Sequence, residues 1–464
     1  MLHLYDTASG SVRPLQLRTE GEVSMYVCGP TVYDLPHIGH GRYNLVFDIL
    51  RRYLLFGGLA VHYVSNVTDV DDNIIKRANE LGRTEADVAG EFEATWWDSM
   101  QALGDLLPDE IPHATAYIDR MVELVAELQG KDVAYETADG VYLEVAKVPG
   151  YGLLAQQSLE SLQAGARVEA NEDKRSPLDF VLWKKAKEGE PSWDSPWGPG
   201  RPGWHTECVV MSLDILGEGF DLHGGGQDLK FPHHENERAQ AVADGKDFAH
   251  HWMHNGWVEV EGAKMSKSLG NFTTLSDMLA RHDARAYRIL VLRAHYRSPI
   301  EVTPETIVDA EKALDRLDGL ARRFAVGGML EQTPEGFVVE GTAPAIDLVE
   351  GPVADFKTHM DDDLDTAGAL ADIFELVTTA HSMGDAGDEG AQAMARTAAV
   401  LLAALGVSLQ GESGEVDEAA ARLVAERDEA RRAKDFARAD ALRGELVALG
   451  WTVEDTPGGT AIRR

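Results

Sequence analysis

The string His37-Ile38-Gly39-His40 places two imidazole rings three residues apart, after a predicted strand and at the start of a predicted helix. The first turn of a helix offers unpaired backbone N–H groups and the positive end of the helix dipole, so it is suited to bind phosphate. Two histidines on one face of that turn can donate hydrogen bonds to an α-phosphate and to charge that develops during transfer. Gly39 lets a nucleotide approach closely. The alternative is a pair of histidines that only cap the helix.

A second string, Lys264-Met265-Ser266-Lys267-Ser268, lies in a glycine-containing stretch that ends at Gly270-Asn271. Two lysines on a loop can reach the β- and γ-phosphates of a nucleotide and neutralise departing pyrophosphate. The alternative is an ordinary solvated basic loop.

Metal-binding residue types form a third group, which consists of Cys28, Cys208 and the stretch 231–237. His233 and Glu237 are four residues apart, so they share one face of a helix. Two thiolates, one imidazole and one carboxylate are a plausible zinc set, and a catalytic zinc keeps an open coordination position. His234 and Glu235 are competing ligands, and a purely structural histidine cluster is the alternative.

The composition describes a globular chain of 464 residues that is 44% hydrophobic and carries a net charge of −35. This length predicts two to four domains. The acidic balance excludes an overall basic footprint for nucleic acid and leaves only local basic surfaces. We find no apolar run of the roughly 20 residues needed to span a bilayer, and charged residues interrupt positions 1–20. We therefore expect a cytoplasmic protein without membrane partners, whose two cysteines are thiols or metal ligands.

The local pattern predicts a parallel α/β sheet. Residues 23–27 form a β-like run, apolar residues recur with helical spacing from 45 to 54, and 60–64 form a second strand. Ligands bind such sheets at the carboxyl ends of the strands, where Cys28 and Thr68 fall. Residues 110–170 differ in pattern and predict an insertion. Residues 305–410 are predicted to be mostly helical, and a linker, a charged helical hairpin at 417–449 and a short strand pair are predicted to follow.

The histidine and lysine strings, in this order on an α/β chain, resemble the two signatures of class I aminoacyl-tRNA synthetases. Longer strings resemble the cysteinyl-tRNA synthetase family over residues 20 to about 300, and the resemblance continues more weakly to the C-terminus. The strings that carry it are residues 28–34, 66–72, 177–184, 193–198, 203–208 and 223–226.

This resemblance implies an α/β fold: a Rossmann-like parallel-sheet catalytic domain with an insertion, followed by an α-helical bundle and a small C-terminal α+β anticodon-binding region. We expect the catalytic domain in two halves at 1–109 and 176–262, with a connective insertion at 110–175. The lysine loop and stem-contact region is expected at 263–305, the bundle at 306–407 and the anticodon-binding region at 417–464.

The resemblance also implies one Zn²⁺ per chain, held by Cys28, Cys208, His233 and Glu237, with the substrate thiol joining as a thiolate. Cysteine differs from serine only by sulfur in place of oxygen, which an apolar pocket distinguishes poorly. Zinc prefers thiolate to a neutral hydroxyl and favours loss of the thiol proton. A metal–sulfur bond can therefore make an editing domain unnecessary, and the short insertion agrees with this.

Further pocket residues are expected around the amino acid and the nucleotide. Cys28, Gly29 and Thr31 are expected beside the substrate, and Thr68 and Trp204 are expected to frame it, with plain core packing as the alternative for Trp204. His223 is expected to contact the substrate or the adenylate. Gly226 and Asp228 fit a close-approach turn with a carboxylate for the ribose hydroxyls, although Gln227 replaces the serine typical of the family.

The implied reaction has two steps. The carboxylate of L-cysteine attacks the α-phosphate of ATP, which carries Mg²⁺, and pyrophosphate leaves. The side chains expected to stabilise the charge are His37, His40, Lys264 and Lys267. The adenylate then passes its acyl group to the 2′-hydroxyl of the terminal ribose of tRNA(Cys).

Contact with tRNA is expected on the C-terminal hairpin, where arginines recur three or four residues apart. The residues expected to contact tRNA are Arg427, Arg431, Arg432 and Arg438. Interleaved acidic residues permit the alternative of an exposed hairpin with internal salt bridges. No extended heptad or apolar patch predicts an interface, so we expect a monomer.

Three alternatives stay open. A cysteine ligase of mycothiol synthesis forms the same adenylate and transfers it to an amino sugar, but it typically lacks the C-terminal region. A nucleotidyltransferase could share the histidine motif without the lysine loop and the zinc set. An RNA-binding paralogue without activity would be expected to lose the histidines or the lysines. Cysteine-dependent ATP–pyrophosphate exchange, followed by the choice of acceptor, separates these alternatives.

Overall fold

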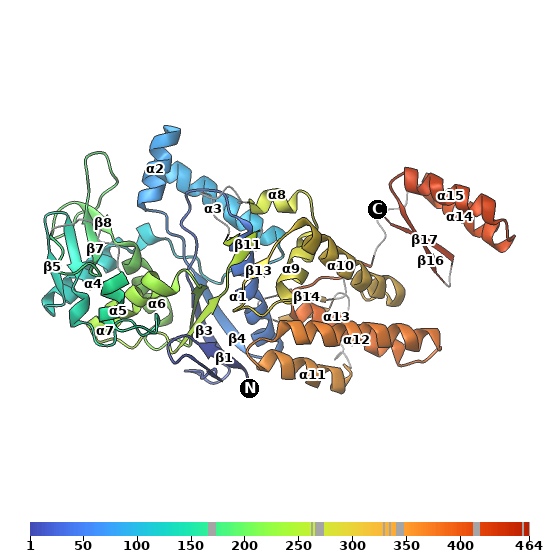
Figure 1. The fold of residues 1–464 in the computed structure, drawn as a ribbon, viewed down its shortest axis with the longest axis horizontal. Helices are drawn as coiled ribbons and strands as arrows, with labels where there is room; N and C mark the ends of the chain where they lie inside the picture. The colour runs from blue at the N-terminus through green and yellow to red at the C-terminus, as the bar shows by residue number, and fades with distance from the viewer. Residues whose placement is uncertain are drawn as a thin grey trace.

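The computed structural model describes residues 1–165, 173–260, 263–264, 273–327, 330–333, 336–339, 348–411, 418–456 and 459–463. The molecule is elongated, with its N-terminal half at one end and the C-terminal helical hairpin at the other (Figure 1). Lys267 lies outside the described residues.

A four-stranded parallel sheet organises the N-terminal half. Its order is β10 (His251–Asn255), β9 (Leu222–Gly226), β3 (Glu22–Val27) and β4 (Ala60–Ser65). Five of the six residues of β3 are buried, as expected for a strand that is covered on both faces. The predicted strands at 23–27 and 60–64 are confirmed.

Helices connect these strands and cover the sheet. Helix α1 (Ile38–Phe56) links β3 to β4 and contains the helical spacing predicted from 45 to 54, and Gly57 forms its C-terminal cap. Helix α6 (Trp204–Leu216) leads into β9. A π-helical turn (Lys230–His234) and α7 (Glu235–Asp244) then lead into β10. Residue 28, the start of α1 and the residues after β9 and β10 therefore meet at one edge of the sheet.

The insertion forms a second, antiparallel sheet. Its order is β5 (Ala134–Glu136), β6 (Gly140–Leu143), β7 (Phe180–Lys185) and β8 (Gly200–Pro202). Both β7 and β8 come after the predicted boundary at 175, so this sheet continues to Pro202. The extension has a packing reason, because Trp183 of β7 is fully buried in the same core as Val141 and Leu143 of β6.

Further elements surround the two sheets. Helices α2 (Asp72–Leu81) and α3 (Glu85–Ala102) follow β4, and α4 (Ile118–Gly130) and α5 (Leu159–Gly165) belong to the insertion region. Short 3₁₀ turns span Ala114–Tyr117 and Val145–Lys147. An N-terminal hairpin pairs β1 (His3–Asp6) with β2 (Ser11–Pro14). A small sheet has the order β12 (Ala263–Lys264), β11 (Val258–Val260) and β13 (Ile300–Glu301).

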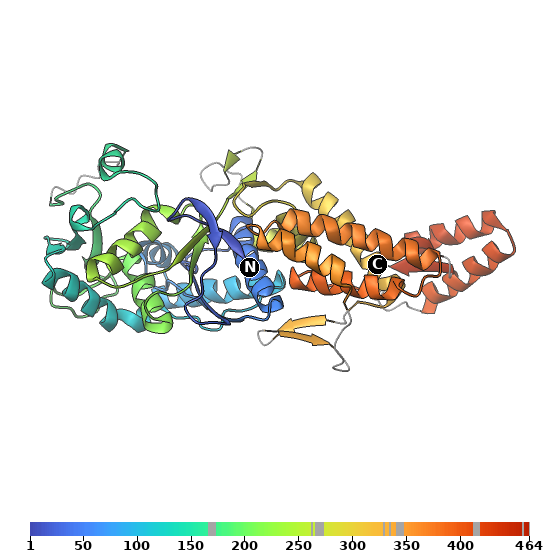
Figure 2. The same cartoon turned by 90° about the horizontal axis from the view of Figure 1, so that it is seen from below.

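The C-terminal half is helical. After α8 (Leu275–Leu279) and α9 (Ala284–Leu292) come α10 (Pro304–Phe324), α11 (Glu350–Asp361), α12 (Thr366–Asp385) and α13 (Ala391–Ala404). The sequence did not predict the hairpin of β14 (Leu330–Thr333) and β15 (Gly336–Val339), which projects from the bundle in Figure 2. The core of the bundle is continuous with the core between α1 and the parallel sheet.

The last region has a hydrophobic core of its own, centred on Leu442 and Trp451. It consists of α14 (Glu418–Arg432), α15 (Phe436–Ala448) and the antiparallel pair β16 (Thr452–Thr456) and β17 (Gly459–Arg463). The predicted hairpin and strand pair are thus confirmed. Among the residues that the structure describes, none of the helices is both long and apolar enough to cross a bilayer.

Candidate active site and metal cluster

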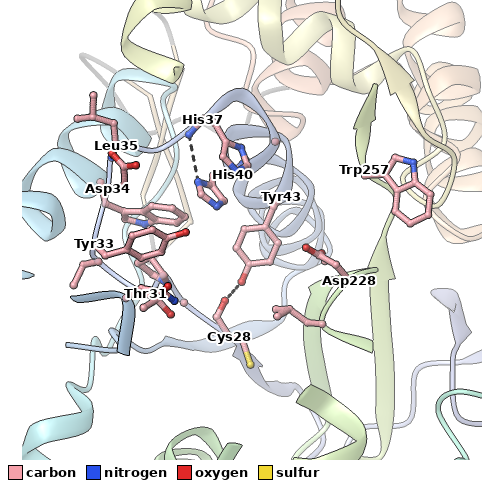
Figure 3. A pocket seen from close by; sticks show the side chains of 18 of the residues that line it. Cys28, Thr31, Tyr33, Asp34, Leu35, His37, His40, Tyr43, Asp228 and Trp257 are labelled. Carbon is pink, nitrogen blue, oxygen red and sulfur yellow. Dashed lines mark hydrogen bonds between the residues drawn. The ribbon is translucent and has the colours of Figure 1, made fainter. Parts of the chain in front are cut away.

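A cavity of 510 Å³ opens at the carboxyl edge of the parallel sheet, beside the first turn of α1. In Figure 3, His37 and His40 lie on one side of it, Trp257 on another, and Cys28 at its base. The lining contains nine residues that the sequence analysis selected, which are Cys28, Gly29, Thr31, His37, Gly39, His40, Trp204, Gly226 and Asp228.

The two histidines form a capping box at the start of α1. Nδ1 of His37 accepts from the backbone N–H of His40 at 3.2 Å, and Nδ1 of His40 accepts from that of His37 at 3.3 Å. Their rings stack with centroids 3.6 Å apart. Capping and phosphate binding are therefore compatible, because the cap uses Nδ1 of each ring and a ligand would be reached through Nε2.

Four predicted metal ligands converge behind the base of the cavity. Sγ of Cys28 lies 3.5 Å from Sγ of Cys208 and 3.4 Å from Oε1 of Glu237. Nε2 of His233 lies 3.7 Å from Sγ of Cys208 and 2.9 Å from Oε1 of Glu237. One ligand atom of each residue lies within 4.8 Å of all the others, and all four side chains are buried.

These separations fit a single tetrahedral ion. Ligand atoms about 2.0–2.3 Å from one zinc ion lie about 3.3–3.8 Å from one another. The two distances from Cys28 and the Cys208–His233 distance fall in that range, whereas His233 and Glu237 are drawn closer by their own hydrogen bond. The donor set of two sulfurs, one nitrogen and one oxygen is also of the type that zinc takes.

The ionisable side chains of this cluster shift one another's pKa values. Burial raises the pKa of Cys28, whose thiol donates to Cys208 and Glu237. Burial would also raise the pKa of Cys208, but hydrogen bonds with Cys28 and His233 lower it to about 6. Burial opposes the charge of His233, yet Glu237 and Cys208 raise its pKa to about 10. His233 and His223 hold the pKa of buried Glu237 well below its usual range. Binding of a cation at this centre would require the loss of protons from the thiols and the imidazole, so metal binding here should depend on pH.

On the side away from the other ligand candidates, Glu237 contacts a buried histidine. Nε2 of His223 lies 2.7 Å from Oε2 of Glu237, and the ring of His223 is fully buried and stacks on Trp252. His223 therefore does not line the cavity, where the sequence analysis expected it to contact the substrate. His223 and His234, with Cys28 and Glu237, form an overlapping set of ligand atoms that contains only one sulfur.

The remaining ligand candidates have other partners. Oε2 of Glu235 accepts from the backbone N–H of Leu154 at 2.7 Å, which directs this carboxylate toward the insertion. Nδ1 of His234 lies 2.9 Å from Nε2 of His254. Glu235 is therefore not a competing ligand in this arrangement.

Of the two residues that were expected to frame the substrate, Trp204 lines the cavity and Thr68 does not. Thr68 is 1% exposed, donates a hydrogen bond from its hydroxyl to Glu207 at 2.7 Å, and does not line the cavity. Trp204 is 37% exposed and stacks on His233 with centroids 3.9 Å apart. Plain core packing is therefore wrong for Trp204, which covers a metal-ligand candidate and lines the cavity.

Two glycines allow close approach of chain segments. A Cβ on Gly29 would lie 1.6 Å from the carbonyl oxygen of Asn66, and one on Gly226 would lie 2.6 Å from Oδ1 of Asp228. Any side chain at these positions would therefore displace the backbone beneath the cavity or the carboxylate of Asp228.

Sequence reasoning missed several residues that line the cavity. The hydroxyl of Tyr43 donates to the carbonyl of Cys28 and so joins α1 to the end of β3 (Figure 3). Trp96 packs 5.0 Å from the ring of His40, and Trp257 lines the opposite wall. Tyr43 could have been found, because it lies three residues after His40 on the same helical face.

Of the two lysines that were expected to bind phosphate, the structure describes the backbone of one. Lys264 belongs to β12, where it pairs with Glu259 of β11. Lys267 lies outside the described residues.

The C-terminal arginines do not form one exposed row. Arg427 is 3% exposed and donates to Oγ1 of Thr460 at 2.6 Å, so its expected contact with tRNA is wrong: it joins α14 to β17. Arg438 pairs with Glu426 at 3.0 Å, which matches the alternative of internal salt bridges. Arg432 is exposed and donates to the carbonyl of Asp428, and Arg431 is half-buried.

The fold is similar to that of solved synthetase structures. Mycobacterium tuberculosis methionyl-tRNA synthetase in complex with methionyl-adenylate matches with a TM-score of 0.59 at 15% identity, over 83% of this chain and 89% of that chain. A putative arginyl-tRNA synthetase from Campylobacter jejuni matches with a TM-score of 0.55 at 13% identity, over 86% of this chain and 95% of that chain. At this identity, the likeness concerns the fold alone.

Family models and curated relatives cover the chain. Residues 14–312 match the tRNA synthetases class I (C) catalytic domain, residues 355–410 the DALR domain, and residues 413–463 the cysteinyl-tRNA ligase anticodon binding domain. The cysteine–tRNA ligase of Syntrophotalea carbinolica is 44% identical over 99% of both chains. That of Methylobacillus flagellatus is 45% identical over the full length of both.

Fold, cavity and matched domains define a class I aminoacyl-tRNA synthetase, an enzyme of the ligase class. Within that class, the chain belongs to the cysteine–tRNA ligase family. The resemblance in the sequence strings is thereby confirmed, and the mycothiol alternative is not favoured because the anticodon-binding domain is present.

Proposed function

We propose that the chain activates L-cysteine with ATP and transfers it to the terminal ribose of tRNA(Cys). The observation that carries this proposal is that Cys28 belongs both to the buried metal-ligand cluster and to the wall of the cavity that begins at His37 and His40. The proposed thiol-binding centre and the first turn of α1, which would bind phosphate, therefore border the same cavity. ATP-dependent activation of cysteine requires this, because the two substrates must be held next to each other.

Zinc is the metal that this ligand set suits best. Cys28, Cys208, His233 and Glu237 would hold it, and His223 would orient Glu237 from behind. When bound, zinc supplies an open position that accepts a thiolate in preference to a neutral hydroxyl. Trp204, which stacks on the ring of His233, forms the cavity wall on that side.

The nucleotide lies over the first turn of α1. The backbone N–H groups and the His37 and His40 rings stabilise the α-phosphate while the cysteine carboxylate attacks it and pyrophosphate leaves. Gly39 allows close approach, and Asp228 with Gly226 accepts the ribose hydroxyls. Lys264 and Lys267 neutralise the β- and γ-phosphates, together with the Mg²⁺ that accompanies ATP. The 2′-hydroxyl of the terminal ribose of tRNA then attacks the acyl carbon of the adenylate, the bond between the acyl carbon and the phosphate oxygen breaks, and AMP leaves.

The C-terminal regions bind the tRNA in this proposal. Residues 263–305 contact the acceptor stem, 306–407 form the bundle, and 417–464 read the anticodon, with Arg431, Arg432 and Arg438 as contacts. We further propose that the chain acts as a monomer in the cytoplasm.

Cysteine-dependent ATP–pyrophosphate exchange tests the first step, and the choice of acceptor tests the second. We expect exchange that requires cysteine, followed by charging of tRNA(Cys) and no transfer to an amino sugar. Exchange driven equally well by other amino acids would contradict the assignment of the first step. Transfer to the amino sugar alone would contradict that of the second.

A further inference from the structure

The segment that carries Lys264 is tied to α1 on its C-terminal side through the backbone. The described chain resumes at Thr273, whose carbonyl accepts from the N–H of Ile38 at 3.3 Å, and the N–H of Leu275 donates to the carbonyl of Pro36 at 2.8 Å. Both contacts flank the first turn of α1, which contains His37 and His40. Residues after the lysine string are therefore fixed to the phosphate-binding turn.

The N-terminal side of the same segment is tied to α1 by one side chain. Nη1 of Arg42 donates to the carbonyl of Trp257 at 2.6 Å, immediately before β11 begins at Val258. Nη2 donates to the carbonyls of Tyr296 at 3.2 Å and Ser298. Since β11 pairs with β12, which contains Lys264, Arg42 joins the helix of the histidines to the strands that lead to the lysines.

Arg42 is buried as a charged side chain, which is energetically unfavourable unless its hydration is replaced. It is 1% exposed, and its partners among the described residues are carbonyl oxygens with no carboxylate. Burial lowers its pKa to about 10, so the guanidinium stays charged at neutral pH. A buried cation is tolerated only when hydrogen bonds replace its hydration. The planar fork of arginine reaches three separate carbonyls, a geometry that a single ammonium group does not reproduce.

We propose that Arg42 is a positioning residue for the activation of cysteine: it fixes the separation between the His37–His40 turn and the strand pair that carries Lys264. It does not line the cavity, so it acts through Trp257 and β11 and is not a catalytic residue. This inference rests on the proposed function, because it assigns opposite ends of one ATP molecule to the two segments that Arg42 joins. The four metal-ligand candidates lie behind the base of the cavity and are not among the hydrogen-bond partners of Arg42.

The test compares Arg42→Gln and Arg42→Lys with the matched pair Arg51→Gln and Arg51→Lys. Arg51 lies on the same helix, is fully buried, and donates to the carbonyl of Leu107 and to Asp109, both at 2.6 Å. Each full-length protein is assayed for thermal unfolding, bound zinc, and cysteine-dependent ATP–pyrophosphate exchange with ATP and cysteine varied separately.

We expect kcat for exchange to fall about 100-fold in Arg42→Gln and about tenfold in Arg42→Lys, because a displacement of about 1 Å suffices for such losses. The KM for cysteine and the zinc content stay within about threefold of the wild-type values, since the ground-state binding of cysteine is untouched. The Arg51 variants unfold at lower temperature but keep the wild-type kcat.

Equal losses of kcat in the Arg42 and Arg51 variants would overturn the proposal. Such a result would mean that loss of either buried arginine lowers activity through reduced stability of the protein. If Arg42→Gln does not fold, Arg42→Lys decides, and a wild-type kcat in that variant would overturn the proposal as well. Wild-type protein without cysteine-dependent exchange would instead contradict the proposed function, so the two failures are distinguishable.

Discussion

The sulfur atoms of Cys28 and Cys208 lie 3.5 Å apart, although 180 residues separate the two cysteines in the chain. Cys28 directly follows β3, and Cys208 lies in the second turn of α6, which leads to the neighbouring strand β9. The parallel sheet therefore creates the sulfur pair, and His233 and Glu237 complete the cluster from the turn and helix that follow β9. In the proposed function, selectivity for the amino acid would therefore depend directly on the fold.

Replacement of Cys208 by serine should remove the metal. We expect Cys208→Ser to lower zinc affinity by more than about 100-fold, since a serine hydroxyl keeps its proton and is a poor ligand beside sulfur. Metal analysis after dialysis measures the loss. Ser212→Ala is the control, because Ser212 is fully buried on the same helix and its hydroxyl, among the residues that the structure describes, donates to the carbonyl of Val209. Full zinc occupancy in Cys208→Ser would contradict the assigned ligands.

The observed capping role of His37 can be separated from its proposed phosphate-binding role by substitution. Asparagine is a favoured N-cap, so His37→Asn should keep the stability of α1 while kcat for pyrophosphate exchange falls about 100-fold. Thr303→Ala provides the reverse case, because Thr303 forms a similar capping box on α10, outside the cavity lining. It should cost about 1 kcal/mol of stability and leave kcat unchanged. Normal exchange by His37→Asn would remove His37 from the mechanism.

Strong local periodicity made the sheet and its first helix predictable. Apolar runs mark β3 and β4, and Gly57 marks the end of α1, so local sequence and final structure agree there. The end of the insertion was not predictable, because β7 pairs with β6 across almost forty residues of intervening chain and no local signal reports that pairing. The β14–β15 hairpin did have a local signal, because residues 333–336 read Thr-Pro-Glu-Gly, a turn sequence between two short β-like runs, but it lies in a region that was predicted as mostly helical.

Side-chain direction limited the prediction of the site. Spacing placed His233 and Glu237 on one helical face, and the family resemblance added Cys28 and Cys208 to complete the ligand set that the structure brings together. Neither signal could show that the hydroxyl of Thr68 turns away to Glu207. Position alone placed His223 near the substrate, whereas its ring is buried behind Glu237. Arg427 was misassigned for the same reason, because hairpin periodicity does not reveal that β17 covers it.

Asp363 makes the stability of the molecule sensitive to acid. It accepts hydrogen bonds from Tyr296 at 2.7 Å and Arg297 at 2.9 Å, and it joins the bundle to the N-terminal strand through the N–H of Tyr5. Burial would raise the pKa of Asp363, but hydrogen bonds from His295, Tyr296 and the backbone of Tyr5 lower it from 3.8 to about 2. The folded chain therefore binds this proton more weakly than the unfolded chain.

A depressed pKa gives stability that is present above pH 3.8 and is lost as pH falls toward 2. We expect Asp363→Asn to cost about 2 kcal/mol at pH 7 and about half of that at pH 3. Urea unfolding of both proteins at pH 7, 4 and 3 measures the difference. A difference that is constant across this range would show that the charge of Asp363 does not contribute.

Deletion of the C-terminal region should affect the transfer to tRNA much more than the activation of cysteine. Residues 420–462 have a hydrophobic core of their own, apart from the core that joins the sheet to the bundle. Deletion of 411–464 should leave cysteine-dependent pyrophosphate exchange within about threefold of the full chain and abolish most charging of tRNA(Cys), because ground-state contacts with the anticodon are lost. Equal loss of both activities would argue against a separate tRNA-binding role.

The most direct test of the central claim is the ratio of kcat/KM for cysteine to that for serine in pyrophosphate exchange, measured with zinc-loaded and with metal-depleted protein. The claim is that a metal held by Cys28, Cys208, His233 and Glu237 selects the thiol. Zinc-loaded protein should prefer cysteine by several orders of magnitude, more than the roughly 10–200-fold that an apolar pocket provides. Metal-depleted protein should lose that preference, and zinc should restore it. An equal preference with and without metal would contradict the claim.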